Sequence, residues 1–227
     1  MSLDKRYYIE FTGAHGAGKT HTYHAIAKQQ LLKPYKSLYP GQVKRPRFHF
    51  LINCPLIALK NIKHIFFVIS FFLRYAETCL INFKILRTLI KMIILHPYYN
   101  RFDFNIFLKD DMLHMIQRII FKIDLNIEKL FREYFMHFIY LYDGLIFVDI
   151  NTTVMHERFK KRFPGKSQNF IKSRRIIHNR VKTQSKMLRN VIISQTAVPY
   201  LVINGNEEVS KNAENVVTFI NKKIIKV

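Results

Sequence analysis

The chain has 227 residues and a formal net charge of +22, from 37 Lys and Arg against 15 Asp and Glu. A hydrophobic fraction of 49%, with 20 Phe and 12 Tyr, excludes a disordered basic tail, and the length suits a single domain spanning residues 1–227. Two cysteines are too few for a disulfide framework, which favours a cytoplasmic protein.

The positive charge lies in two blocks. Residues 1–102 carry 16 basic and 3 acidic side chains, and residues 158–206 carry 12 basic side chains and no acidic one. Between them, residues 103–157 carry 5 basic and 9 acidic side chains. Such a surplus indicates an anionic partner, which is a nucleotide phosphate, a nucleic acid backbone or an anionic membrane surface.

The first predicted elements flank a glycine-rich loop. The run from Tyr7 to Thr12 predicts a strand, and the stretch from Thr20 to Leu32 predicts a helix. Between them stands the phosphate-binding pattern G-x-x-x-x-G-K-T, whose residues are Gly13, Ala14, His15, Gly16, Ala17, Gly18, Lys19 and Thr20. Such a loop binds nucleotide phosphates through its backbone N–H groups, with Lys19 reaching the β- and γ-phosphates and Thr20 a Mg²⁺ ion.

The middle of the chain is predicted to be mostly helical. Residues 50–96 combine an apolar face with interspersed Lys and Arg, so this face either packs into the core or lies on an anionic membrane. The most apolar stretch, residues 64–73, is too short to cross a bilayer. The run from Phe104 to Leu108 predicts a second strand leading into Asp110 and Asp111, and helical spacing returns from Met112 to Phe138.

The last third alternates strands and helices. Gly144 to Ile150 is a nearly continuous apolar run, typical of a strand buried on both faces of a parallel sheet. A helix capped by Thr152 or Thr153 is expected to run to about Phe163. A fourth strand is predicted from Pro199 to Ile203 and a closing helix from Val209 to Ile220. This alternation predicts a three-layer α/β fold around a parallel sheet.

Two segments resemble the thymidylate kinase family and its nucleoside and nucleoside-monophosphate kinase relatives. In GLIFVDINTTVMHERFKKR, residues 144–162, the strand ends at an Asp and the next helix carries Glu-Arg and then a lid arginine. In VPYLVINGNEEVSKNAENVVTFI, residues 198–220, the pattern is similar to that family's last strand, adenine-side loop with Gly205, and closing helix. The resemblance implies a three-layer P-loop NTPase fold with a helical cap or acceptor region at about 35–100 and a basic lid at about 158–190.

The resemblance also implies the remaining site residues. The family's third core strand ends in an acidic residue beside the P-loop, which here is Asp110 or Asp111, with Asp110 favoured. That carboxylate would orient Mg²⁺ or accept a proton from the attacking oxygen, while the other caps the helix near Met112. Arg158 and Arg162 would compensate the charge of the transferring phosphoryl group. Met112 follows Asp111 where the family has an arginine, so the acceptor is left open.

We therefore expect a Mg-ATP-dependent phosphotransferase acting on a small acceptor. One alternative is a nucleotide-dependent binding module on nucleic acid or an anionic membrane, which the charge surplus favours. Another alternative is a kinase acting on polynucleotide ends, which would use both the P-loop and the basic blocks. The basic stretch from Lys166 to Arg189 is expected either to extend the lid or to contact nucleic acid. The sequence leaves open whether the protein forms a homodimer.

Overall fold

The computed structural model describes residues 5–14, 16–29, 31–33, 35, 37–38, 59, 62–75, 90, 103–109, 113, 116, 127–162, 164–165 and 168–226. Most of the predicted helical stretch 50–96 lies outside these residues, as do His15, Asp110 and Asp111. Within the described part of the chain, no helix is both long and apolar enough to cross a membrane.

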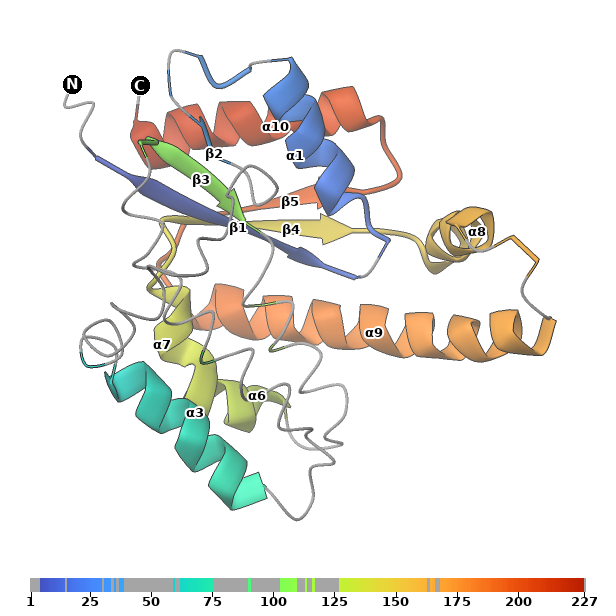
Figure 1. Cartoon of the computed structure of the whole chain (residues 1–227), viewed down its shortest axis with the longest axis horizontal. Coiled ribbons are helices and arrows are strands. Elements are labelled where there is room, and N and C mark those ends of the chain that lie inside the picture. The colour runs from blue at the N-terminus through green and yellow to red at the C-terminus, as the bar shows by residue number, and fades with distance from the viewer. Residues whose placement is uncertain are drawn as a thin grey trace, which may run out of the picture.

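A five-stranded parallel sheet forms the centre of the molecule, with strand order β2-β3-β1-β4-β5 (Figure 1). Its strands are β1 (Tyr7–Gly13), β2 (Ser37–Leu38), β3 (Ile106–Lys109), β4 (Gly144–Asp149) and β5 (Tyr200–Asn204). Four of them were predicted, and β2 was missed because it is only two residues long and lies in a stretch that Pro34 and Pro40 indicate as a loop. The predicted parallel α/β sheet is thus confirmed.

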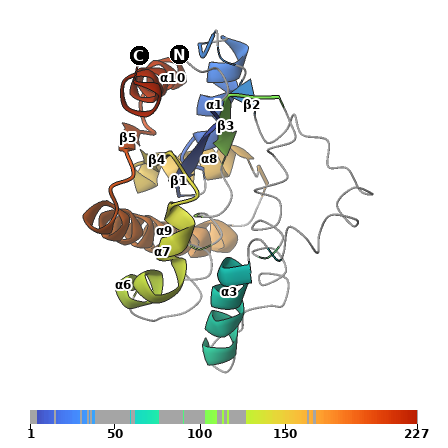
Figure 2. The same cartoon turned by 90° about the vertical axis from the view of Figure 1, so that its left-hand side faces the viewer.

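Two layers of helices cover the two faces of this sheet (Figures 1 and 2). On one face lie α1 (Lys19–Lys28) and α10 (Val209–Phe219), the latter continued by a π-helical turn, η3 (Ile220–Ile225). On the other face lie α9 (Gln168–Gln195) and the shorter helices α6 (Ile127–Leu130) and α7 (Met136–Ile139). The three-layer arrangement expected from the sequence is therefore present.

Alternation along each strand explains why the sheet is buried on both sides. In β1, Ile9 and Phe11 pack with Ile26 of α1, whereas Tyr8 packs with Phe138 of α7 on the opposite face. Successive side chains of a strand point to opposite faces, so one strand supplies both cores at once. Glu10 lies in the same strand and is fully buried.

Helical spacing from Met112 to Phe138 predicted the helical region that lies below the sheet, and the residues described there are helical. Its described part contains the π-helical turn η2 (Phe131–Phe135) between α6 and α7. This turn buries Phe131, Tyr134 and Phe135 together, against Phe71 of α3 (Ile62–Tyr75) at ring-centroid distances of 5.2 Å to Tyr134 and 5.1 Å to Phe135. One side of α3 therefore packs into the core, as one of the two interpretations of this segment expected.

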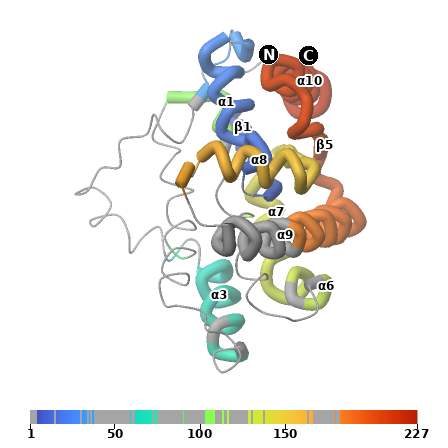
Figure 3. The backbone as a smooth tube through the Cα atoms, turned by 90° about the vertical axis from the view of Figure 1, so that its right-hand side faces the viewer, coloured from blue at the N-terminus to red at the C-terminus, as the bar shows by residue number. Residues whose placement is uncertain are grey.

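Two helices follow β4 and lie around the carboxyl ends of the strands (Figure 3). The first, α8 (Thr152–Arg162), was predicted to start with a Thr cap, but Asn151 caps it, because its Oδ1 accepts the N–H of Thr153 at 3.0 Å. The second, α9, is a single helix of 28 residues. Leu188 and Ile192 in its second half are buried in the core, which fixes how the helix is rotated against the sheet.

Candidate functional site

The loop between β1 and α1 has the strand-loop-helix context that its glycine pattern requires. Gly13 has φ +139°, and a Cβ there would overlap the Val148 carbonyl oxygen of the neighbouring strand β4. Gly16 and Gly18 have φ values of +84° and +101°. These backbone conformations favour glycine, so the three glycines of the motif are explained by the path of the loop.

Lys19 lies inside this loop. It is 6% exposed, and its Nζ donates to the carbonyl oxygens of Gly13 at 3.0 Å and Ala14 at 3.2 Å. Thr20, the next residue, is exposed at the start of α1. The positive end of a helix and the N–H groups of its first turn attract anions, so the loop, Lys19 and α1 together form an anion-binding site.

Arg158 of α8 joins this loop to the segment after β5. Its Nη2 donates to the Gly205 carbonyl at 2.8 Å, and its Nη1 lies 3.4 Å from the carbonyl oxygens of both Gly16 and Ala17. The positions it connects are 47 to 142 residues away in sequence. The resemblance pointed to Arg158, but the contact with these three carbonyls could not be read from the sequence.

Gly205 is closely surrounded by backbone atoms of this region. Its N–H donates to the Asp149 carbonyl oxygen at 2.5 Å, and a Cβ at this position would lie 2.5 Å from the Ala17 oxygen and 3.0 Å from the Asp149 oxygen. A side chain at position 205 would thus push the loop after β5 away from the P-loop. The following helix, α10, contacts the end of β5 through Asn212, whose Nδ2 donates to the Asn204 carbonyl oxygen at 2.8 Å.

A cavity of about 800 Å³ opens where these elements meet. Its volume is in the range of small-molecule binding sites. Arg162, one turn beyond Arg158 on α8, lines it as an exposed side chain, so the two arginines predicted together do share one cavity. Other residues lining it are Gly18, Lys19, Thr20, Gly205 and Asn212.

The predicted acidic group is not among the described residues. β3 ends at Lys109, which pairs with Glu10 of β1, and Asp110 and Asp111 follow it in sequence. The buried Glu10 accepts the N–H of Leu113 through Oε1 at 2.5 Å, so this carboxylate fixes a backbone position shortly after the acidic pair. A charged residue inside a predicted strand was the signal for Glu10, and the sequence reasoning did not use it.

Few of the described groups could hold a metal ion. Thr20, whose hydroxyl stands at the start of α1 beside the cavity, fits the role of a Mg²⁺ ligand in a P-loop. Within the described ranges, no three His, Cys, Asp or Glu side chains gather as a metal-binding group.

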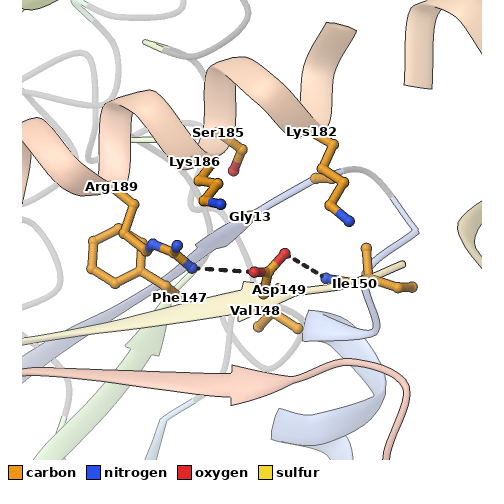
Figure 4. A pocket seen from close by; sticks show the side chains of 10 residues that line it. Gly13, Phe147, Val148, Asp149, Ile150, Lys182, Ser185, Lys186 and Arg189 are labelled. Carbon is orange, nitrogen blue, oxygen red and sulfur yellow. Dashed lines mark hydrogen bonds and ion pairs between the residues drawn. The ribbon is translucent and has the colours of Figure 1, made fainter. Parts of the chain in front are cut away.

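Part of the basic stretch from Lys166 to Arg189, which was expected to extend the lid or contact nucleic acid, lies on α9 opposite the end of β4 (Figure 4). Arg189 donates from Nη1 to Oδ2 of Asp149 at 3.3 Å, and Oδ1 of Asp149 accepts the N–H of Ile150 at 2.9 Å. Lys182 and Lys186 lie on the same side of α9. The signal in the sequence was the spacing of these three cations in a stretch without acids.

The structure of this chain is similar to solved structures of other proteins. No protein-family model matches the chain, and no curated protein matches it. The structure of a deoxyadenosine kinase from M. mycoides with bound dCTP is similar, with 17% identity, a TM-score of 0.50, and coverage of 95% of this chain and 99% of that one. The same enzyme with the products dCMP and a flexible dCDP gives 15% identity, a TM-score of 0.53 and the same coverage. The chain therefore has the fold of a P-loop kinase, which it shares over nearly its whole length with a deoxyadenosine kinase.

Proposed function

We propose that this protein is a Mg-ATP-dependent phosphotransferase of the nucleoside and nucleotide kinase type. The observation that carries the proposal is the cavity at which the P-loop, Arg158 of α8 and Gly205 meet, at the carboxyl edge of the sheet. Ligands of open parallel α/β sheets bind at this edge. The likeness to a deoxyadenosine kinase solved with dCTP, and with dCMP and dCDP, supports a nucleotide as the ligand.

The donor nucleotide fits the P-loop side of this cavity. The phosphates would be held by the loop N–H groups, the N-terminus of α1 and Lys19, which is already held inside the loop by two carbonyls. The base would lie between Arg158, Gly205 and Asn212 in the 800 Å³ cavity. Mg²⁺, when bound beside Thr20, would neutralise phosphate charge.

In the proposed reaction, an oxygen atom of the acceptor attacks the γ-phosphorus of ATP. The bond from that phosphorus to the bridging β,γ-oxygen breaks, and ADP leaves with the electron pair. Asp110, or Asp111, would take the proton of an attacking hydroxyl, and Arg158 with Arg162 would compensate the charge of the transferring group. Phosphoryl transfer needs mainly such positioning and charge compensation.

The acceptor class is proposed more broadly than thymidylate. A nucleoside or nucleotide is the first class to test, because the structurally similar enzyme is a deoxyadenosine kinase and was solved with dCMP as a product. A helical cap formed by residues 35–100 would cover the acceptor, and residues 158–190, which include the end of α8 and most of α9, would serve as the lid.

A transfer assay with γ-³²P-ATP tests this function. The acceptors are nucleosides, nucleoside monophosphates, sugars and oligonucleotides with free ends, and the variants are Lys19→Ala and, as a control, Lys28→Ala at the exposed end of the same helix. We expect transfer to a nucleoside or nucleotide, reduced by at least about 100-fold in Lys19→Ala and unchanged in the control. ATP binding without transfer to any acceptor would overturn the proposal in favour of a binding module, and transfer to oligonucleotides alone would favour a polynucleotide-end kinase.

A further inference from the structure

A second, smaller hollow lies on the α9 side of the P-loop (Figure 4). Its volume is about 20 Å³, which accommodates one oxygen-sized atom. It is bounded by the first two residues of the P-loop, the end of β4 and one face of α9. Its lining includes Gly13, Ala14, Asp149, Lys182, Lys186 and Arg189. This hollow is separate from the 800 Å³ cavity, which borders the loop from Gly16 onward.

The charges around the hollow do not cancel. Arg189, with a side chain 16% exposed, forms an ion pair with Asp149 at 3.3 Å, and Asp149 also accepts the Ile150 N–H. The one carboxylate is therefore matched by one guanidinium and one backbone donor. Lys182 and Lys186 add two positive charges for which the described part of the chain shows no ion-pair partner.

The packing of α9 decides which side of the helix carries the two lysines. Positions 182, 186 and 189 recur at helical spacing and so share a face, on which like charges repel one another. Leu188 and Ile192 are buried in the core and set the rotation of the helix, which leaves Lys182 half-buried and Lys186 exposed beside the hollow. In Figure 4 the Lys186 side chain is directed toward Gly13 and the Lys182 side chain toward Ile150. Neighbouring cations that repel one another beside a cavity for an oxygen atom are suited to binding an anion.

The position of the hollow indicates which anion it binds. In the proposed function the donor phosphates would occupy the loop from Gly16 to Thr20, which lines the larger cavity together with residues of α8 and α10. The hollow borders the start of the same loop from the opposite layer of the fold, where α9 lies (Figure 1). An anion bound there would stand beside the donor phosphates without competing for their contacts.

We propose that Lys182 and Lys186 form the phosphate subsite of the acceptor, and that the acceptor is therefore a nucleoside monophosphate and not an uncharged nucleoside. This inference rests on the proposed function and specifies its substrate class. An oxygen of the acceptor's phosphate attacks the γ-phosphorus of ATP, the bond to the bridging β,γ-oxygen breaks, and a nucleoside diphosphate and ADP are released. The two ammonium groups hold the remaining oxygens of the acceptor phosphate and reduce its repulsion from the donor.

Steady-state kinetics with matched pairs of nucleosides and their 5′-monophosphates test the subsite. The variants are Lys182→Ala, Lys186→Ala and the double variant, with Lys186→Arg as the conservative change. Lys222→Ala, an exposed lysine of η3, is the control for loss of one charge. We expect the KM for the monophosphate to rise at least about tenfold in each alanine variant, while the KM for ATP stays within about twofold. Lys186→Arg and Lys222→Ala should resemble the wild type.

Two kinetic results would overturn the inference. One is a wild-type enzyme with a lower KM for nucleosides than for their monophosphates. The other is an equal loss with both acceptors in the alanine variants, which would place the lysines on the transferring phosphoryl group.

A binding measurement separates this inference from the proposed function. If the wild type transfers phosphate to no acceptor, the proposed function fails, and calorimetric titration with nucleoside monophosphates still tests the subsite. Binding at least about tenfold weaker in the double variant than in the wild type would support the subsite, and equal or absent binding in both would refute it.

Discussion

Replacing Arg158 with alanine tests whether this side chain holds the site together. The 2.8 Å bond from Nη2 to the Gly205 carbonyl is a charge-assisted hydrogen bond, while the two contacts of Nη1 at 3.4 Å are long and weak. Because Arg158 is only half-buried, water replaces part of what is lost, and we expect the free energy of unfolding to fall by about 1–2 kcal/mol. In a domain of this length that corresponds to a Tm lower by about 2–8 °C.

Arg162→Ala is the matched control for this variant. It removes the same charge from the same cavity, but Arg162 is exposed and lies one turn further along α8, so the free energy of unfolding should change by less than about 0.5 kcal/mol. Thermal unfolding followed by circular dichroism measures both variants without ligand, and a titration with Mg-ATP measures affinity, which Arg158→Ala should weaken by about tenfold. If both variants had the same Tm, or if Arg158→Ala unfolded at the wild-type temperature, the bridging role of Arg158 would be refuted.

Two further changes have outcomes that follow from the structure. Gly205→Ala places a Cβ 2.5 Å from the Ala17 oxygen, so the two loops must separate, and we expect chemical denaturation to show a loss of about 1–3 kcal/mol together with weaker Mg-ATP binding. Unchanged stability and unchanged affinity would contradict this packing. Burial lowers the pKa of His64 on α3 below its ordinary value of 6.5, so below that value the unfolded chain binds more protons than the folded one. Stability should therefore decline as the pH falls from about 7.5 through 6.5, more in the wild type than in His64→Phe, and an NMR titration showing His64 at or above 6.5 would refute it.

The sequence alone determined the first part of the site. A β-branched and aromatic run, three spaced glycines and a helix without Gly or Pro specify β1, the P-loop and α1, because each of these features acts between neighbours in the chain. The same is true of the alternating strands and helices that predicted a three-layer parallel sheet. Local signals were less reliable at element ends, where Asn151 and not a threonine caps α8.

Short-range patterns also could not reveal the π-helical turns η2 and η3. Their extra residue per turn is decided by which side chains reach the core, as with Phe131, Tyr134 and Phe135 against α3. The helical spacing of that stretch is confirmed for its described residues, but it carried no sign of the wider turn.

Only the tertiary structure decided how the separate cations are used. Arg158 contacts Gly205, 47 residues away in sequence, and Gly16 of the P-loop, 142 residues away. Arg189 contacts Asp149, which is 40 residues away in sequence. Such pairings depend on the order of the strands and on the rotation of α8 and α9, which buried residues such as Leu188 set far from the charges themselves. The net charge of +22 could be counted in the sequence, but which of those charges lie beside the P-loop was decided by the packing of α8 and α9 around the sheet.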